Sequence, residues 1–228
     1  MTKIDIAVIP AKAFSRRLPN KNIKKFFGKP IISYAISKAV KSKCFKKIFV
    51  STDSEKIRNI SLKYGADIFN LRSSKYTKDK TTLLDLMSYE CKRIKKQYPL
   101  VRNICCILPT ALFFNIKQLK KSKKILNNKK SIKFSFVCSE IESGLSKTFF
   151  IKKNKIKITN KMFLKKNSQF LPKFYIDAGQ FYYSRIESWI KKRDIFDNNC
   201  NLIKVPSNKF VDINYPSDWK KAIKIFKK

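Results

Sequence analysis

Apolar residues along the chain alternate between two spacings. Short, nearly continuous apolar runs predict buried strands, which we place at residues 4–9, 47–51, 66–69, 103–108, 133–138, 180–184 and 202–205. Apolar residues at helical spacing predict helices between them, at 31–40, from the capping residues 52–54 to 64, at 83–97, at 116–126, and from Pro216 onward. This alternation predicts an α/β fold with a mostly parallel sheet and helices on both faces.

Residues 149–170 depart from this alternation because the helical period disappears. The runs 149–151 and 155–158 indicate a small β-hairpin lobe that turns at 153–154. A chain of 228 residues is long enough to close one α/β core. We therefore expect a single domain over 1–228, in which 149–170 forms a lobe or a dimerisation arm.

The charge balance is unusual for a chain of this kind. Lys and Arg number 53 against 15 Asp and Glu, which gives a net charge of +38. Such a surplus is typical of proteins that bind nucleic acid or an anionic membrane. The lysines are spread in ones and twos among Asn, Ile and Phe, however, and spread charge supports only salt-sensitive, non-specific binding. We therefore do not expect nucleic acid as a dedicated partner.

Targeting signals and cysteines constrain the compartment. The first apolar run ends at Pro10 and is too short for a signal-peptide core, and no stretch approaches twenty uncharged apolar residues. The six cysteines form no CxxC pair, and no histidine is present to complete a mixed zinc site. The sequence thus predicts a cytoplasmic protein with reduced thiols and no membrane partner.

A basic loop follows the first predicted strand. Lys12, Arg16, Arg17 and Lys21 lie in it, and Ser15 adds a hydroxyl donor. At the carboxyl end of a parallel strand, these groups are suited to binding a polyphosphate. A solvated basic turn explains the spacing equally well in so lysine-rich a chain, because an anion site also needs convergent backbone N–H groups.

Several segments in order along the chain resemble one enzyme family. The loop 10–22, together with 27–31 and 50–53, is similar to the start of the CMP-sugar synthetases, which include the N-acylneuraminate cytidylyltransferases. In that family the loop usually reads Pro-Ala-Arg, two small residues, Ser-Lys-Arg, two residues and Lys-Asn. The segments 168–169, 177–182 and 211–219 resemble its pseudaminic acid cytidylyltransferase branch.

The resemblance implies a fold, a reaction and partners. The family has a Rossmann-like sheet of the nucleotide-diphospho-sugar transferase type, and dimers are common in it. Its members use Mg²⁺ and let the anomeric hydroxyl of an acidic nine-carbon sugar attack the α-phosphate of CTP. We therefore expect CTP and an acidic sugar as substrates, Mg²⁺ as cofactor and a homodimer as assembly. Neutralising and positioning the phosphates is the main demand of such chemistry.

The resemblance also assigns roles to individual positions. Lys12, Arg16 and Lys21 would be catalytic, and the nucleotide-binding set would be Lys12, Ser15, Arg16, Lys21, Asn22, Arg72 and Thr110. Sugar contacts would come from Gln169, Asp177 and Gln180. For Asp177 and Gln180, the alternative to sugar binding is that they belong to a turn at the start of a strand, with Gly179 chosen for its backbone freedom. No histidine can act as general base, so a carboxylate or metal-bound water would take the proton.

Asp212 and Asn214 occupy the metal-binding Asp-x-Asp of the family. Two carboxylates at this spacing on an extended segment point to one side and can share a hard cation. Asn214 brings no charge, so metal affinity should fall; alternatively, Asn214 only helps to cap the helix at Pro216.

Two further departures concern the substrates. Phe14 replaces a small residue in the loop and could crowd the phosphates, and Ile176 replaces the histidine before Asp177. Together with Asn214, these departures favour an alternative to the active enzyme: a family relative that binds nucleotide without turnover. A basic nucleic-acid-binding module is the third hypothesis.

Overall fold

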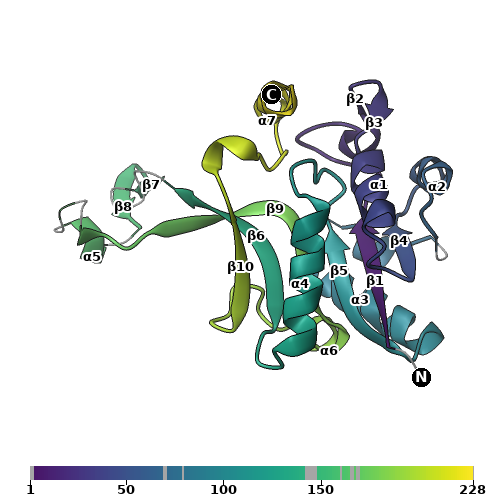
Figure 1. The fold of residues 1–228 in the computed structure, drawn as a ribbon. Coiled ribbons are helices and arrows are strands. Elements are labelled where there is room, and N and C mark those ends of the chain that lie inside the picture. Colours follow the sequence, from purple (N-terminus) through teal and green to yellow (C-terminus); the bar gives the residue numbers. More distant parts are fainter. Residues whose placement is uncertain are drawn as a thin grey trace.

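A central sheet of six strands organises the protein (Figure 1). The computed structural model describes residues 3–68, 71–78, 80–141, 148–159, 161–164, 167 and 170–227. The strand order is β10–β6–β9–β5–β1–β4. Their bounds are β1 Ile4–Pro10, β4 Lys47–Ser51, β5 Val101–Ile107, β6 Phe134–Ile141, β9 Phe174–Arg185 and β10 Cys200–Val205. Only β9 runs antiparallel to its neighbours among these six, which confirms a mostly parallel sheet.

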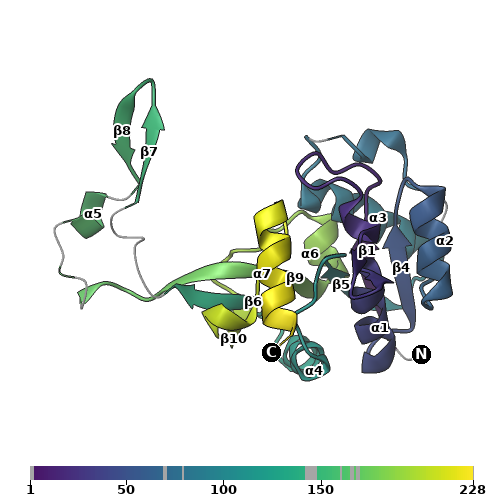
Figure 2. The ribbon, with the colours of Figure 1, turned by 90° about the horizontal axis from the view of Figure 1, so that it is seen from above.

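Helices cover both faces of this sheet, as the sequence predicts (Figure 2). On one face, Ala7 and Ile9 of β1 pack with α1 (Ile32–Ser42), α2 (Glu55–Lys63) and α4 (Ile116–Asn128). On the other, Ile6 and Val8 pack with α3 (Leu83–Gln97) and α6 (Ile186–Ile190). The alternation follows from the two-residue period of a strand, and it makes residues 6–9 of β1 apolar on both faces. No helix in these described ranges is long and apolar enough to span a membrane.

A third, smaller apolar cluster lies outside the sheet. Helix α7 (Pro216–Phe226) packs Trp219 and Ala222 against Phe26, which belongs to the short hairpin of β2 (Lys25–Phe26) and β3 (Lys29–Pro30). The described ranges also contain three short 3-10 turns: η1 (Lys21–Ile23), η2 (Ser74–Tyr76) and η5 (Ser207–Lys209). The end of the chain is thereby held beside the loop that follows β1.

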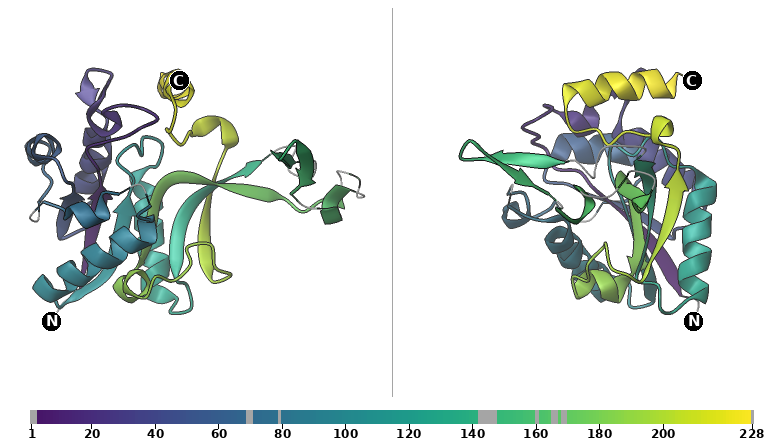
Figure 3. Two further views of the ribbon diagram at one scale, coloured as in Figure 1. Left: turned by 180° about the vertical axis from the view of Figure 1, so that it is seen from behind. Right: turned by 90° about the vertical axis from the view of Figure 1, so that its left-hand side faces the viewer.

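The predicted hairpin lobe is present as β7 (Phe149–Lys152) and β8 (Lys155–Ile158). It turns at Lys153 and Asn154, whose φ angles of 50° and 55° lie in the left-handed region, and the short helix α5 (Lys161–Leu164) follows. The hairpin projects away from the six-stranded sheet in every view (Figure 3).

Three details differ from the expected elements. The predicted strand at 66–69 is absent over 66–68, where the one bridge, between Asp67 and Phe49, is too short to form a strand. Residue 69 of that prediction lies outside the described ranges. Helix α6 was not expected. Strand β9 begins at Phe174 instead of 180, so Asp177 and Gly179 lie within it. Asp and Gly are depleted in strands, and the pairing register of β9 with β6 shifts at this point, so the apolar pattern is interrupted.

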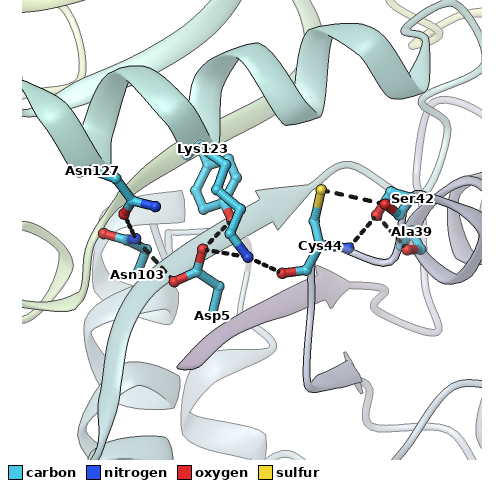
Figure 4. A network of polar contacts seen from close by, with 8 residues as sticks. Asp5, Ala39, Ser42, Cys44, Asn103, Lys123 and Asn127 are labelled. Carbon is cyan, nitrogen blue, oxygen red and sulfur yellow. Dashed lines mark hydrogen bonds and ion pairs between the residues drawn. The ribbon is translucent and has the colours of Figure 1, made fainter. Parts of the chain in front are cut away.

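A buried carboxylate near the amino end of β1 joins four elements (Figure 4). Asp5 of β1 accepts hydrogen bonds from Asn103 Nδ2 of β5 at 2.9 Å and from the Tyr183 hydroxyl of β9 at 2.7 Å. Lys123 Nζ of α4 lies 3.3 Å from the same carboxylate and donates to the Cys44 carbonyl. Asp5 is only 6% exposed, so this network compensates for the loss of water around the charge.

We predict that Asp5→Ala lowers the free energy of unfolding by about 3 kcal/mol, because Lys123 and Asn103 lose a buried acceptor. Urea unfolding measures this loss. As a control, Glu55→Ala removes an exposed pair with Arg58 and should cost about 1 kcal/mol or less. Equal losses in the two variants would contradict a structural role for the network.

Candidate functional site

A cleft of about 400 Å³ opens at the carboxyl ends of β1 and β5. Most of the residues that the sequence proposed for a site meet in its wall: Lys12, Lys21, Asn22, Arg72, Thr110, Asp212 and Asn214. Asp212 and Asn214 lie far along the chain from Lys12, Lys21 and Asn22, and the packing of α7 beside the first loop brings these two segments together. Ser15 and Arg16 belong to the same loop but lie outside the lining, with Ser15 half-buried and Arg16 exposed.

Asp53 fixes the loop that follows β1. Its Oδ1 accepts the backbone N–H of Ala13 at 2.8 Å and lies 3.6 Å from Nη2 of Arg72. The backbone N–H of Ala11 donates to the carbonyl of Ser51 at the end of β4. One carboxylate thus holds both the basic loop and a buried arginine at the edge of the cleft.

Asn22 and Arg72 present buried polar atoms with no hydrogen-bond partner in the described part of the chain. Asn22 Nδ2 donates to the Lys12 carbonyl at 2.9 Å, which orients the amide and leaves Oδ1 unpaired. Arg72 Nε and Nη2 make no hydrogen bond, although Nη2 lies in the ion pair with Asp53, and burial lowers the pKa of the guanidinium. Each side chain is only 6% exposed. Unpaired buried groups cost about 1–3 kcal/mol each, so this arrangement indicates a ligand with complementary groups.

Cations line the opposite wall around Asn214. Lys21 Nζ donates to the Ile213 carbonyl at 2.7 Å, and burial lowers its pKa. Arg17 Nη2 donates to Asn214 Oδ1 at 3.0 Å, and Asn214 Nδ2 donates to Asp212 Oδ2 at 2.6 Å. Asp218, not the Asn214 side chain, accepts the backbone N–H groups of Asn214 and Tyr215 where α7 begins. The Asn214 side chain therefore belongs to the cleft.

Among the described residues, Asp212 is the one carboxylate that lines this cleft. Burial raises its pKa. A Cβ atom on Gly179 would lie 2.7 Å from Asp212 Cγ, and Gly179 has a φ of +59°, so only glycine permits this close approach. In the described ranges, no group of three His, Cys, Asp or Glu side chains could hold a metal ion. One carboxylate suits Mg²⁺ when phosphate oxygens supply the remaining ligands.

The predicted sugar-binding residues are distributed differently. Asp177 lies outside the cleft lining and borders a second cavity; its carboxylate accepts the Gly179 N–H at 3.1 Å and the Tyr182 hydroxyl. Burial raises its pKa, and the charge of Asp212 adds to the shift. Gln180 is buried: Oε1 accepts the Phe113 N–H at 2.9 Å, and Nε2 donates to the Ala178 carbonyl. Gln169 lies outside the described residues.

Sequence reasoning missed part of the cleft wall. Arg17 was noted in the basic loop but not selected, and Lys78, Thr81 and Thr82 were not considered. Thr82 caps α3 by accepting the Asp85 N–H at 3.1 Å. The spacing of Thr82 and Asp85 is typical of a helix N-terminus, so the sequence could have placed the start of α3 here.

Comparisons with known proteins identify relatives of this chain. The family described as cytidylyltransferase matches residues 6–194. The pseudaminic acid cytidylyltransferase of Campylobacter jejuni is 31% identical over 225 residues, covering 98% of this chain and 96% of its own. A CMP-N,N'-diacetyllegionaminic acid synthase of Legionella pneumophila is 43% identical over 86 residues, 36% of this chain and 37% of its own.

The fold comparison reaches more distant proteins. A CMP:2-keto-3-deoxy-manno-octonic acid synthetase solved with CTP gives a TM-score of 0.72 at 12% identity and covers 98% of both chains. The 4-diphosphocytidyl-2C-methyl-D-erythritol synthase of Anaerococcus prevotii gives 0.66 at 14% identity over 99% of both. These likenesses show the Rossmann-like nucleotidyltransferase fold.

We predict that Asp177→Asn stabilises the protein at neutral pH. A raised pKa means that the folded state binds protons more tightly than the unfolded chain, so stability falls as pH rises through that window. The amide removes this penalty, and its advantage over the native protein should shrink as pH falls toward about 4. Unfolding free energies at pH 7 and pH 4 measure it.

The matched control has the opposite sign. A hydrogen bond from Lys192 lowers the pKa of Asp85, so Asp85→Asn should lose stability at neutral pH and less in acid. The same pH dependence of stability in both variants would refute the raised pKa of Asp177 as the cause of the effect.

Proposed function

This chain belongs to the cytidylyltransferase family, and from that premise we propose that it joins CTP to an acidic nine-carbon sugar and releases pyrophosphate. Pseudaminic acid, or a related nonulosonate, is the proposed sugar. The support is similarity over nearly the full chain to a protein named for that substrate, together with shorter matches to legionaminic acid and N-acylneuraminate enzymes.

The unpaired atoms of Asn22 and Arg72 are the observation that carries the nucleotide assignment. Cytosine offers an amino donor at N4 and acceptors at N3 and O2. These groups complement one buried acceptor, Asn22 Oδ1, and two buried donors, Arg72 Nε and Nη2. Uracil would instead place its O4 acceptor where Asn22 requires a donor. The pair therefore supports CTP over UTP.

The basic wall suits the triphosphate. Lys12, Arg17 and Lys21 line the cleft, and we propose that they neutralise the phosphate charge that develops as pyrophosphate leaves. Ser15 and Arg16 stay proposed phosphate contacts at the outer end of the same loop. Thr110, buried after β5, faces the same cleft and is proposed to contact the nucleotide.

Mg²⁺ is the proposed cofactor, held by Asp212 together with phosphate oxygens. The ion would supply charge neutralisation at the phosphates. Asn214 offers no second carboxylate, and its amide oxygen is bonded to Arg17. We propose that the loss of one negative charge here is offset because Arg17 and Lys21 then bear a larger part of the phosphate charge.

Asp177 is the proposed sugar-side carboxylate. Its pKa is raised by burial, and a raised pKa favours acceptance of a proton from the attacking hydroxyl near neutral pH. Gln180 is bonded at both ends to backbone, so we propose that it acts by holding the segment after Thr110 against β9. Gln169 stays a sugar-binding proposal from resemblance alone.

Two alternatives have less support. Phe14, which could have crowded the phosphates, is 67% exposed and lies outside the cleft lining, so this argument against turnover is removed. The two Campylobacter jejuni relatives that match 98% of this chain are named as cytidylyltransferases, which favours an active enzyme over a nucleotide-binding or nucleic-acid-binding protein.

We also propose a homodimer that forms through the segment 149–170. Side chains of β7 and β8 are exposed on both faces of the hairpin, among them Phe150, Ile151 and Ile156 at 54%, 70% and 64%. Exposed apolar groups concentrated on one arm are typical of an interface. Light scattering after gel filtration should give a dimer, and Ile151→Asp a monomer. A dimer unaffected by Ile151→Asp, or equally disrupted by Leu62→Asp on α2, would refute this contact.

The proposed location is the cytoplasm. All six cysteines are free thiols, in agreement with a reducing compartment. Recovery of the protein in an extracytoplasmic fraction would refute this.

We predict pyrophosphate release from CTP and Mg²⁺ with one of three sugars: pseudaminic, legionaminic or N-acetylneuraminic acid. UTP should be poorer by at least about tenfold, because it leaves Asn22 Oδ1 unpaired. EDTA should abolish release. Lys12→Ala should lower kcat/KM about 100-fold, because one preorganised cation at the phosphates is lost.

Lys63→Ala, on the exposed side of α2, removes the same charge outside the cleft and should leave activity unchanged. Silence with every sugar, alongside retained CTP binding, would favour nucleotide binding without turnover. Salt-sensitive binding of DNA or RNA with no preference for CTP would favour the nucleic-acid alternative.

A further inference from the structure

Glu90 is a buried carboxylate to which the proposed reaction assigns no role. Among the residues that the structure describes, Asp5 and Glu90 are the two buried acids, and Glu90 is only 2% exposed. Asp5 joins several elements near the amino end of β1, whereas Glu90 lies in α3 and contacts the end of β4. Burying a charged group costs free energy unless partners compensate, so the position of Glu90 needs an explanation.

Two hydrogen bonds fix the Glu90 side chain. The Ser51 hydroxyl donates to Oε1 at 2.7 Å, and Arg93 Nη1 donates to Oε2 at 3.0 Å. Arg93 follows one turn later in α3, and its side chain is 24% exposed. Arg93 therefore supplies a compensating charge from the surface, while Ser51 connects the carboxylate to the sheet.

Ser51 ends β4 beside the loop that follows β1. Its carbonyl accepts the Ala11 N–H at 2.8 Å, and the carbonyl of Thr52 accepts the Arg72 N–H at 2.7 Å. The basic loop and Arg72 are thus attached to the same two residues after β4. The bond from Ser51 to Glu90 holds this turn from the side of α3.

Glu90 also acts on the charge of Arg72. Burial lowers the pKa of the Arg72 guanidinium, and the charges of Asp53 and Glu90 oppose that shift. Both oxygens of Glu90 are bonded to other side chains, and Arg72 Nε and Nη2 make no hydrogen bond. Glu90 therefore stabilises the buried cation without occupying the donors that face the nucleotide.

We propose that Glu90 is a positioning residue for the nucleotide, which holds the turn after β4 and the Arg72 guanidinium so that the Arg72 donors meet the base. The inference rests on the proposed function and deepens it by adding a residue that selects CTP without touching it. Cytosine accepts at N3, whereas uracil carries an N–H there, which opposes a fixed donor. A firmly held Arg72 therefore contributes to the choice of CTP over UTP.

The test compares the native protein with Glu90→Gln in the full chain. Glutamine keeps an acceptor for Ser51 but removes the charge beside Arg72. The KM for CTP should rise about tenfold and the KM for UTP less than about threefold, with kcat for CTP within about twofold, because the base is remote from the reacting phosphate.

Ser51→Ala is a second variant in case the first does not fold. It removes the hydroxyl and keeps the charge of Glu90. It should raise the KM for CTP about threefold, because one hydrogen bond that holds the turn is lost.

Asp5→Asn is the matched control, because Asp5 is the other buried acid and lies at the end of β1 remote from the cleft. It should lower stability and leave the preference for CTP unchanged. An unchanged preference in both Glu90→Gln and Ser51→Ala, or an equal loss of preference in Asp5→Asn, overturns the proposal.

Calorimetric binding of CTP and UTP separates this inference from the proposed reaction. Tighter binding of CTP that Glu90→Gln weakens supports the positioning role even if no pyrophosphate is released, in which case the proposed transfer fails alone. A native preference for CTP that Glu90→Gln leaves intact overturns the positioning role and leaves the proposed function in place. Equal binding of CTP and UTP by the native protein overturns both.

Discussion

The close approach of the Asp212 carboxylate to Gly179 is the contact on which the site depends. It holds the segment before α7 against the bulge of β9, and the same segment carries Asn214 to Arg17 and Lys21 of the first loop. On the other side of Gly179, its N–H orients Asp177. Any side chain at position 179 would displace Asp212 and separate these groups, because a Cβ there would lie 2.7 Å from Asp212 Cγ. The carboxylates of Asp212 and Asp177 are therefore positioned by contacts to one glycine.

Scarce carboxylates explain much of the remaining architecture. With 15 acidic residues against 53 basic ones, the fold uses its negative charges where several elements meet. Asp5 joins β1, β5, β9 and α4, Asp53 holds the first loop and Arg72, and Asp218 accepts the backbone at the start of α7. Most lysines instead lie on the surface, where water and salt screen their mutual repulsion. The large net charge is thus compatible with an ordinary α/β core and with a cleft that needs cations only at particular places.

The sequence predicted most strands of the sheet and part of the residues that line the cleft. Buried parallel strands and amphipathic helices have local signals, so β1, α3 and α4 were placed to within a few residues. The basic loop and the family resemblance brought Lys12, Lys21 and Asn22 to the cleft. The sequence placed the start of β9 too late because Asp177 and Gly179 are poor strand residues locally, and the segment before them is held in the sheet by pairing with β6. The hydrogen-bond partners of Gln180 and Arg17 could not be predicted from the chain alone, because they are 67 and 197 residues away.

The position of β9 has a consequence for synthesis of the chain on the ribosome. Strands β1, β4 and β5 can pair as soon as they emerge, but β6 has no sheet partner until β9 and β10 follow it. Until then the nascent sheet consists of two separate pieces, and each exposes an unpaired strand edge. Insertion of β9 between β5 and β6 closes both edges in one step, with contacts that span much of the chain. The nascent protein is therefore most vulnerable to intermolecular strand pairing during the interval between β6 and β9, when a chaperone would have the most effect on its yield.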